Sequence, residues 1–318
     1  MVRFVFSVED LASTRFAISP MWELVRSLVA LRDPSHAALH VPWLRSLSGR
    51  LDGLALEPAV ALTSPRGFTP DFLTPPPSGP LGSIADDLAA LRATGAAQIR
   101  ADKRLFASQH PRGGATAAPW LAHPRAEVRR LADVLEAYWT RAVEPAWPRV
   151  RSFLDADIAY RSRRLAAGGP AALFADLCEG VSWAQPHLDV RVPVHEATIE
   201  LGGRGLLLMP SAFSATRPFV IDRSPWQPTV IYPARGIATL WEDAPPAPSG
   251  SCASWAPRAP RSSPTSPRRA RPPSSPSACR SAPPGRRITS PRCATPGSSR
   301  RGGRGASSST CARRWATP

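Results

Sequence analysis

The chain has 318 residues, with 40 Lys+Arg against 24 Asp+Glu and a formal net charge of +16. The charge lies at one end, because residues 244–318 contain 14 Arg and no Asp or Glu, which leaves 26 basic and 24 acidic side chains in residues 1–243. This nearly neutral body excludes the simplest interpretation of the total charge, a folded domain with a basic nucleic-acid-binding face.

Residues 1–243 are predicted to form a mixed α/β (α+β) domain. The β-prone residues 2–6 open the chain and are followed by Ser7. Asp10, three positions after that serine, completes the pattern of a capping box. We therefore expect a strand followed directly by a helix that continues to about residue 16.

The middle of this domain is predicted to be helical. Residues 21–31 follow Pro20 and place their apolar side chains largely on one helical face. The Pro-rich stretch between residues 54 and 82 is interpreted as a linker. Three further helices are predicted from helical spacing with Arg-rich polar faces, over residues 84–107, 125–139 and 147–165.

The second half of the domain is predicted to be rich in strands. Residues 187–192 alternate apolar and polar side chains, which is typical of a half-buried strand. Residues 198–201 and 206–210 flank a glycine-rich turn and are expected to form a hairpin. Two more strands are expected, over residues 219–221 and 229–232.

Two pairs of residues invite catalytic interpretations. His195 and Glu196 could serve as an acid/base pair, but neighbours on a strand point to opposite faces, so a structural role is favoured. Cys178 and His187 could be a nucleophile and its base. Because no third orienting group or elbow motif accompanies them, a buried cysteine acting as a small hydrophobe is favoured. We expect the protein not to be an enzyme.

Two other features suggest binding sites. The run Gly202-Gly203-Arg204-Gly205 resembles a phosphate loop only superficially, because no helix start or GK[ST] sequence follows it, and it is interpreted as a turn. Aromatic side chains often line small-molecule pockets, although core packing is the favoured role for each one. The tryptophans considered for such a pocket are Trp22, Trp139, Trp147 and Trp183.

The remaining composition limits cofactors and cellular location. Cys178 is the one cysteine in residues 1–243, so neither a disulfide framework nor a Cys-rich metal site is expected there, and no cofactor is predicted. No run of about 18 apolar residues indicates a membrane span. The N-terminus has acidic residues where a signal peptide would have its apolar centre, so we expect a cytoplasmic protein.

Residues 244–318 belong to a different physical class. They contain 16 Ser, 15 Pro and 14 Arg, but no Leu or Val, and Ile288 is the one aliphatic side chain beyond Ala and Pro. Such a segment cannot bury enough apolar area to offset the loss of chain entropy. It is predicted to be a disordered Arg/Pro/Ser-rich tail.

A shift of the reading frame accounts for the unusual composition of the tail. When each codon is regrouped as the last base of one codon and the first two bases of the next, Cys and Trp codons become Leu, Met or Val, and TCN Ser codons become Leu, Val, Ile or Phe. The strings RSTTELA, HHL, LRDAGLV and VRTPLGDA are then permitted, in that order, by residues 270–276, 288–290, 293–299 and 311–318.

In this order, the strings resemble the C-terminal winged helix-turn-helix of ArsR-type bacterial repressors, and residues 300–304 fall where the basic wing would lie. The opening of the chain, FSVEDLASTRFAIS, resembles the N-terminal domain that precedes the winged helix in ArsR-like regulators of high-GC bacteria. A high-GC gene also agrees with the usage of basic residues, because Lys103 is the one lysine beside 39 arginines.

The resemblance implies a homodimeric transcription regulator whose recognition helices enter the major groove of operator DNA, about 34 Å apart, and whose N-terminal domain senses a small-molecule effector or sets the dimer geometry. The literal tail does not match that motif, and prolines such as Pro283 and Pro284 would break its helices. We therefore expect the winged helix-turn-helix not to form, and specific DNA binding to be impaired. Metalloid sensing by cysteine is not expected, because the four tail cysteines become Leu, Met or Val in the other frame.

Two alternatives remain open beside this hypothesis. The basic tail could be genuine and bind nucleic acid without sequence preference through its 14 arginines. The domain of residues 1–243 could instead be a small-molecule enzyme, in which case its activity would survive deletion of residues 244–318 and depend on Glu196 or Cys178.

Overall fold

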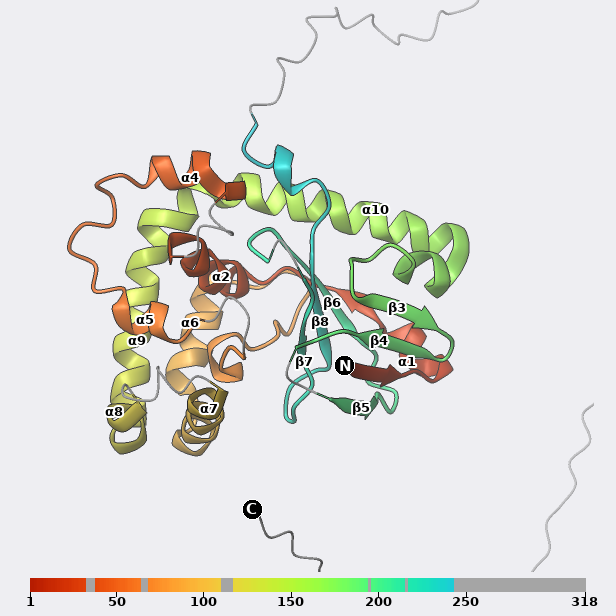
Figure 1. Ribbon diagram of the computed structural model, residues 1–318, viewed down its shortest axis with the longest axis horizontal. Coiled ribbons are helices and arrows are strands. Elements are labelled where there is room, and N and C mark those ends of the chain that lie inside the picture. Colours follow the sequence, from red (N-terminus) through yellow and green to blue (C-terminus); the bar gives the residue numbers. More distant parts are fainter. Residues whose placement is uncertain (33–37, 64–67, 110–116, 194–195, 215–216, 243–318) are drawn as a thin grey trace, which may run out of the picture. The chain divides into compact units, whose positions relative to one another are not determined.

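The computed structural model describes residues 1–32, 38–63, 68–109, 117–193, 196–214 and 217–242 (Figure 1). These residues form a mixed α/β domain, as the sequence predicts. The predictions for the tail, namely disorder and the lost winged helix-turn-helix, lie outside the described residues.

Helices make up the larger part of the described chain, and α10 extends from the helical group to the sheets (Figure 1). Short 3₁₀ turns lie between several of them, and the chain passes from α9 to α10 through a π-helical turn at Trp139–Val143. The α-helices are α1 (Val8–Ser13), α2 (Pro20–Arg32), α4 (Val41–Ser46), α5 (Glu57–Ala61), α6 (Ile84–Ala93), α7 (Ala96–Gln109), α8 (Ala117–Ala122), α9 (Pro124–Tyr138) and α10 (Trp147–Phe174).

The strands form two four-stranded sheets. Sheet A has the order β3-β4-β1-β5, and sheet B has the order β2-β6-β8-β7. In sheet A, β1 pairs antiparallel with β4 and parallel with β5, whereas in sheet B, β6 pairs parallel with both β2 and β8. The strands are β1 (Val2–Val5), β2 (Arg15–Phe16), β3 (Val181–Ala184), β4 (His187–Val190), β5 (Ala197–Glu200), β6 (Leu207–Ser211), β7 (Phe219–Ile221) and β8 (Thr229–Pro233).

The predicted hairpin between residues 198–201 and 206–210 is wrong, although both strands exist. β5 pairs with β1 in sheet A, and β6 pairs with β2 and β8 in sheet B. The glycine-rich turn therefore carries the chain from one sheet to the other. Local sequence indicated two strands and a turn, but the partners of both strands come from distant parts of the chain.

The two central strands of sheet B, β6 and β8, are buried on both faces. Successive residues of a strand point to opposite faces, and β6 and β8 use this alternation to contact two different layers. Leu208 and Val230 pack with the apolar side chains of sheet A, whereas Leu207 and Ile231 pack with Trp22 of α2. Burial on both sides is typical of parallel strands covered by other elements.

Helix α2 is also buried almost completely. The sequence predicts one buried face, but every residue from Pro20 to Ala30 is buried, including the polar residues Glu23, Arg26 and Ser27. The difference arises because α2 has sheet B on one side and helices such as α6 and α5 on another. Polar side chains in such a helix need partners within the protein.

Three other predicted elements differ from the structure in their extent. Helix α1 ends at Ser13, and Arg15–Phe16 forms β2. Strand β2 forms because the backbone N–H groups of Arg15 and Ala17 donate to the carbonyls of Leu206 and Leu208. The predicted helix over residues 84–107 is divided into α6 and α7, with an extended backbone at Thr94. The predicted linker over residues 54–82 is not a simple spacer. It contains α5, and its Phe72 and Leu73 side chains belong to the core.

The single lysine of the chain is buried within the helical group. Lys103 of α7 is 1% exposed, and its Nζ lies 5.3 Å from the ring centroid of Phe106 and 5.2 Å from that of Trp120 on α8. Burial lowers the pKa of its ammonium group to about 8. Its charge therefore rests against two aromatic faces.

The carboxylate of Asp10 joins the first helix to the glycine-rich turn. Its Oδ2 accepts hydrogen bonds from the backbone N–H and the hydroxyl of Ser7, which confirms the predicted capping box. Its Oδ1 accepts the backbone N–H of Gly205 at 2.9 Å. Gly205 has a φ of +67°, and a Cβ placed on it would lie 2.5 Å from the backbone of Ser13.

We expect Gly205→Ala to lower the free energy of unfolding by about 3 kcal/mol or more, because it combines an unfavourable backbone conformation with a steric clash. Gly203→Ala is the matched control, because Gly203 also has a positive φ (+82°) but open space around it. Its cost should be about 1 kcal/mol. Urea denaturation measures both changes, and equal costs would contradict the close packing of Gly205 against Ser13.

Candidate functional site

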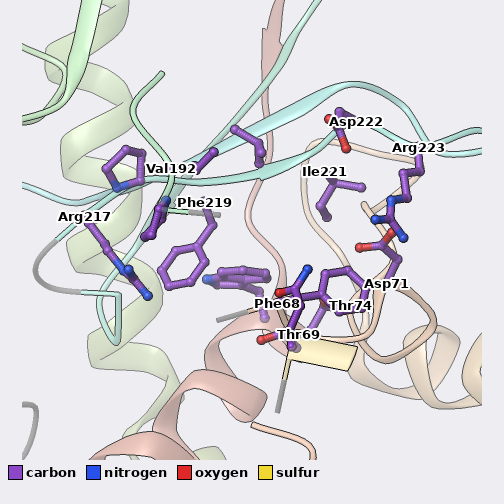
Figure 2. A pocket seen from close by; sticks show the side chains of 15 residues that line it. Phe68, Thr69, Asp71, Thr74, Val192, Arg217, Phe219, Ile221, Asp222 and Arg223 are labelled. Carbon is purple, nitrogen blue, oxygen red and sulfur yellow. The ribbon is translucent and has the colours of Figure 1, made fainter. Parts of the chain in front are cut away.

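A cleft lies beside β7, the edge strand of sheet B, and is lined by residues from several distant segments (Figure 2). These segments include the start of α2, residues 68–74, the end of α7, residues 192–193 and residues 217–223. The free volume within the cleft is about 90 Å³, or about 750 Å³ when its open mouth is included. A concave site with apolar walls and a few polar groups is typical of small-molecule binding.

The apolar wall of the cleft is largely aromatic. Trp22 from α2 meets Phe219 from β7 edge to face, with 5.4 Å between ring centroids, and Phe68 contributes a third ring. The guanidinium groups of Arg26 and Arg217 lie 4.5 Å and 5.2 Å from the centroid of Phe219. One end of the cleft is therefore both aromatic and basic.

Acidic side chains gather at the other end. Figure 2 shows Asp71, Asp222 and Arg223 on the side of the cleft away from Arg217. Asp71 is 5% exposed, and burial raises the pKa of its carboxyl to about 7, helped by the negative charge of Asp102 and opposed by Arg223. This carboxyl therefore changes its charge near neutral pH.

Two further polar groups complete the lining. The hydroxyl of Thr69 is buried and has no hydrogen-bond partner among the described residues, and the same is true of the amide oxygen of Gln109. Both side chains line the cleft. A buried polar atom without a partner is costly, so such groups often await a ligand or water.

The loop that follows β6, residues 212–214, is held to α2 by hydrogen bonds next to the aromatic wall of the cleft. Glu23 of α2 accepts the backbone N–H groups of Ala212 and Phe213 on one carboxylate oxygen, each at 3.0 Å. The indole N–H of Trp22 donates to the hydroxyl of Ser214 at 3.0 Å. Burial raises the pKa of Glu23 to about 7, against the opposing effect of the hydrogen bonds that it accepts.

The same loop reaches an aromatic cluster near the end of the described chain. The Phe213 ring stacks on His40, with 4.4 Å between centroids. Nδ1 of His40 accepts a hydrogen bond from the indole N–H of Trp241 at 3.0 Å. Trp43 packs against Phe213 at 5.0 Å and against Trp241 at 6.3 Å.

The residues proposed from sequence for catalysis do not form a comparable site. Burial raises the pKa of the Cys178 thiol to about 12, and the side chain packs against the core that includes sheet A, although it is partly buried and not fully buried as the sequence predicts. His187 lies at the start of β4, and its Nδ1 has no hydrogen-bond partner among the described residues. Glu196 is exposed, and His195 lies outside the described residues.

The other sequence candidates have distinct outcomes. The glycine-rich run is a turn with positive φ at Gly202, Gly203 and Gly205, as predicted. Of the four tryptophans, Trp22 lines the cleft and the other three pack in cores. Sequence reasoning missed Thr69 and Asp71, which lie in the segment interpreted as a linker. The sequence feature that could have indicated them is the position of Asp71 in a short stretch bounded by two apolar residues, Phe68 and Phe72.

The described residues, 1–32, 38–63, 68–109, 117–193, 196–214 and 217–242, contain neither a cluster of metal ligands nor a helix that could span a membrane. No group of three His, Cys, Asp or Glu side chains in these ranges is arranged to hold a metal ion. None of the helices in the described part of the chain is long and apolar enough to cross a bilayer.

Comparison with known protein families gives a match for part of the chain. Residues 89–238 match a family described as a family of unknown function (DUF5937). Searches of curated proteins and of solved structures found no match. The matched region contains the β7 side of the cleft, while Trp22 and residues 68–74 precede it.

Glu23 makes stability depend on pH in a direction that can be tested. Its pKa is about 7 in the folded protein against an ordinary value of 4.5, so the folded state binds the proton more tightly than the unfolded state. The free energy of unfolding should therefore fall as the pH rises from about 4.5 through about 7, by about 3 kcal/mol from this group. Glu23→Gln, which keeps an acceptor for the loop, should remove this part of the decrease.

Urea denaturation between pH 5 and pH 8 measures the effect. Glu136→Gln is the control, because the Glu136 side chain is 57% exposed and its surface ion pair with Arg92 contributes little to stability. Parallel pH profiles for the wild type and Glu23→Gln would contradict the assignment.

Proposed function

We propose that the protein is a ligand-responsive transcription regulator of the ArsR type. Residues 1–243 bind a small effector in the cleft, and a C-terminal winged helix-turn-helix contacts operator DNA in the intact form of the regulator. In the chain as given, the shifted frame replaces that DNA-binding part, so its specific DNA binding is impaired.

The observation that carries this proposal is a continuous set of contacts from the cleft to the last described residues. Trp22 forms part of the cleft wall, and its indole N–H donates a hydrogen bond to the hydroxyl of Ser214. The neighbouring Phe213 stacks on His40, which accepts the indole N–H of Trp241. A ligand that moves the wall can therefore act on the point where the chain continues toward its C-terminal part.

The frame relation is a second and independent support. A single shift permits four strings that resemble the winged helix-turn-helix in the correct order. The body and the tail would then be two parts of one regulator, the first sensing and the second reading DNA. The enzyme alternative has less support, because partial burial raises the pKa of the Cys178 thiol to about 12, which disfavours the thiolate that a nucleophile needs.

The nucleotide sequence across codons 235–260 tests the frame. We expect an insertion or deletion of one or two bases there, whose correction restores an open frame encoding the four strings. An intact frame that encodes the same tail, found again in close relatives, would overturn this part of the proposal.

DNA footprinting then tests the function. The frame-corrected protein should protect one preferred site with two half-sites about 34 Å apart. The chain as given should show no preferred site. Uniform, salt-sensitive protection by both proteins would instead favour sequence-independent binding by arginines.

A double-mutant cycle tests the contacts between the cleft and the C-terminal end. Ser214→Ala removes the acceptor for Trp22, and Trp241→Phe removes the donor to His40 while keeping an aromatic ring. Because both bonds act through the same loop, we expect the two changes in unfolding free energy to differ from additivity by about 0.5 kcal/mol or more. Trp241→Phe with Arg130→Ala, a change at a 75% exposed side chain, should be additive. Additivity of the first pair would contradict the coupling.

A further inference from the structure

The charged side chains that line the cleft already interact with other groups of the protein. Among the described residues, the lining contains two carboxyl groups, those of Asp71 and Asp222, and two guanidinium groups, those of Arg217 and Arg223. Arg223 attracts the Asp71 carboxylate, and its guanidinium lies 5.1 Å from the ring centroid of Phe68. Arg217 and Asp222 each have partners as well. A charged ligand group would therefore have to compete with these partners.

Two uncharged side chains of the lining, in contrast, have polar atoms without a partner. They are the hydroxyl oxygen of Thr69, a residue that is 8% exposed, and the amide oxygen of Gln109. Both atoms are buried, and neither has a hydrogen-bond partner among the described residues. Because an unsatisfied buried polar atom is unfavourable, a ligand that forms hydrogen bonds with these two side chains improves on the empty cleft.

These two side chains come from elements that pack against each other. Thr69 precedes the 3₁₀ turn Asp71–Leu73, and Gln109 is the last residue of α7. The backbone N–H of Phe72 in this turn donates to Oδ2 of Asp102 on α7 at 2.8 Å, which holds the turn against the helix. Both unpartnered groups therefore belong to the helical side of the cleft.

The aromatic rings determine the remainder of the ligand. Phe68 and Phe219 line the cleft together with Trp22 (Figure 2). Trp22 and Phe219 meet edge to face, with 5.4 Å between their ring centroids. Such walls suit a flat aromatic body.

We propose that the cleft binds an uncharged aromatic compound whose polar group donates and accepts hydrogen bonds, as a carboxamide does. The amide oxygen of Gln109 accepts an N–H group of the ligand, and the hydroxyl of Thr69, which can donate or accept, bonds to a polar atom of the ligand. Each bond is made by its own side chain and is tested separately. The inference rests on the proposed function, which assigns effector binding to this cleft, and adds the chemical class of the effector.

Four probes that share a benzyl group and differ in the group attached to it test the proposal with the full chain. They are phenylacetamide, phenylacetone, the phenylacetate anion and the protonated phenylacetamidine, and titration calorimetry or ligand-observed NMR gives their dissociation constants. Phenylacetamide should bind at least about tenfold more tightly than either ion, because burying a charge without a partner is costly. It should bind about fivefold more tightly than phenylacetone, which accepts hydrogen bonds but cannot donate them.

Three results would overturn the proposal. They are equal or tighter binding of either ion, equal binding of phenylacetamide and phenylacetone, and no binding of any probe.

Variants identify the side chains that hold the polar group. Gln109→Met keeps an unbranched side chain but removes the amide, so it should abolish most of the preference for phenylacetamide over phenylacetone. Thr69→Val keeps the shape of the side chain and should weaken phenylacetamide about threefold or more. Thr198→Val, at an exposed position of β5 outside the cleft lining, is the control and should leave all four affinities unchanged. Unchanged affinities in both cleft variants would contradict the assignment.

The stability of the same variants excludes a merely structural role. Gln109→Met and Thr69→Val should leave the free energy of unfolding of the empty protein unchanged or raise it, because each removes a buried oxygen atom that lacks a partner. Urea denaturation measures this change. A clear loss of stability in either variant would show that its polar group is already satisfied within the protein and would count against the proposal.

The outcomes distinguish this inference from the proposed function. If one of the ions binds best and Phe219→Ala abolishes that binding, the cleft is a ligand site but the uncharged class is wrong. If phenylacetamide binds through Gln109 but does not change the DNA affinity of the frame-corrected protein, the ligand class is right and the regulatory function is wrong.

Discussion

The burial of α2 on all sides is the constraint on which the rest of the structure depends. A helix between sheet B and other helices must satisfy its polar side chains internally. Glu23 does so by accepting two backbone N–H groups, and this fixes the loop that follows β6. The position of that loop places Phe213 against His40. Trp22, which lies beside Glu23 on α2, forms part of the cleft wall. A single buried helix thus organises the core, the loop and the candidate site.

The cleft occurs where this packing leaves the edge of a sheet uncovered by a further strand. β6 and β8 are buried on both faces, whereas β7 is the outer strand of sheet B and presents Phe219 and Ile221 to the cleft. Residues 68–74 meet this edge from the helical side. Charged side chains and aromatic rings therefore line the same cleft.

Local features of the fold were predictable, whereas long-range pairings were not. The capping box of Ser7 and Asp10 depends on residues three positions apart, and the strands over residues 219–221 and 229–232 show in their composition. The pairing of β1 with β5 joins residues almost 200 positions apart, so nothing in the 198–210 region distinguished two sheets from one hairpin. Asp71 was missed for a related reason, since its raised pKa depends on its burial and on the charge of Asp102, which comes from α7. The frame relation of the tail remains a prediction.

The position of Lys103 has a consequence for chemical modification of the described domain. Reagents that acylate amines have two kinds of target in this chain, the α-amino group and this one ammonium, because every other basic side chain is arginine or histidine. Lys103 is 1% exposed between the rings of Phe106 and Trp120. Its acylation therefore requires α7 and α8 to separate locally. The rate at which Lys103 is labelled thus measures how often that part of the domain opens.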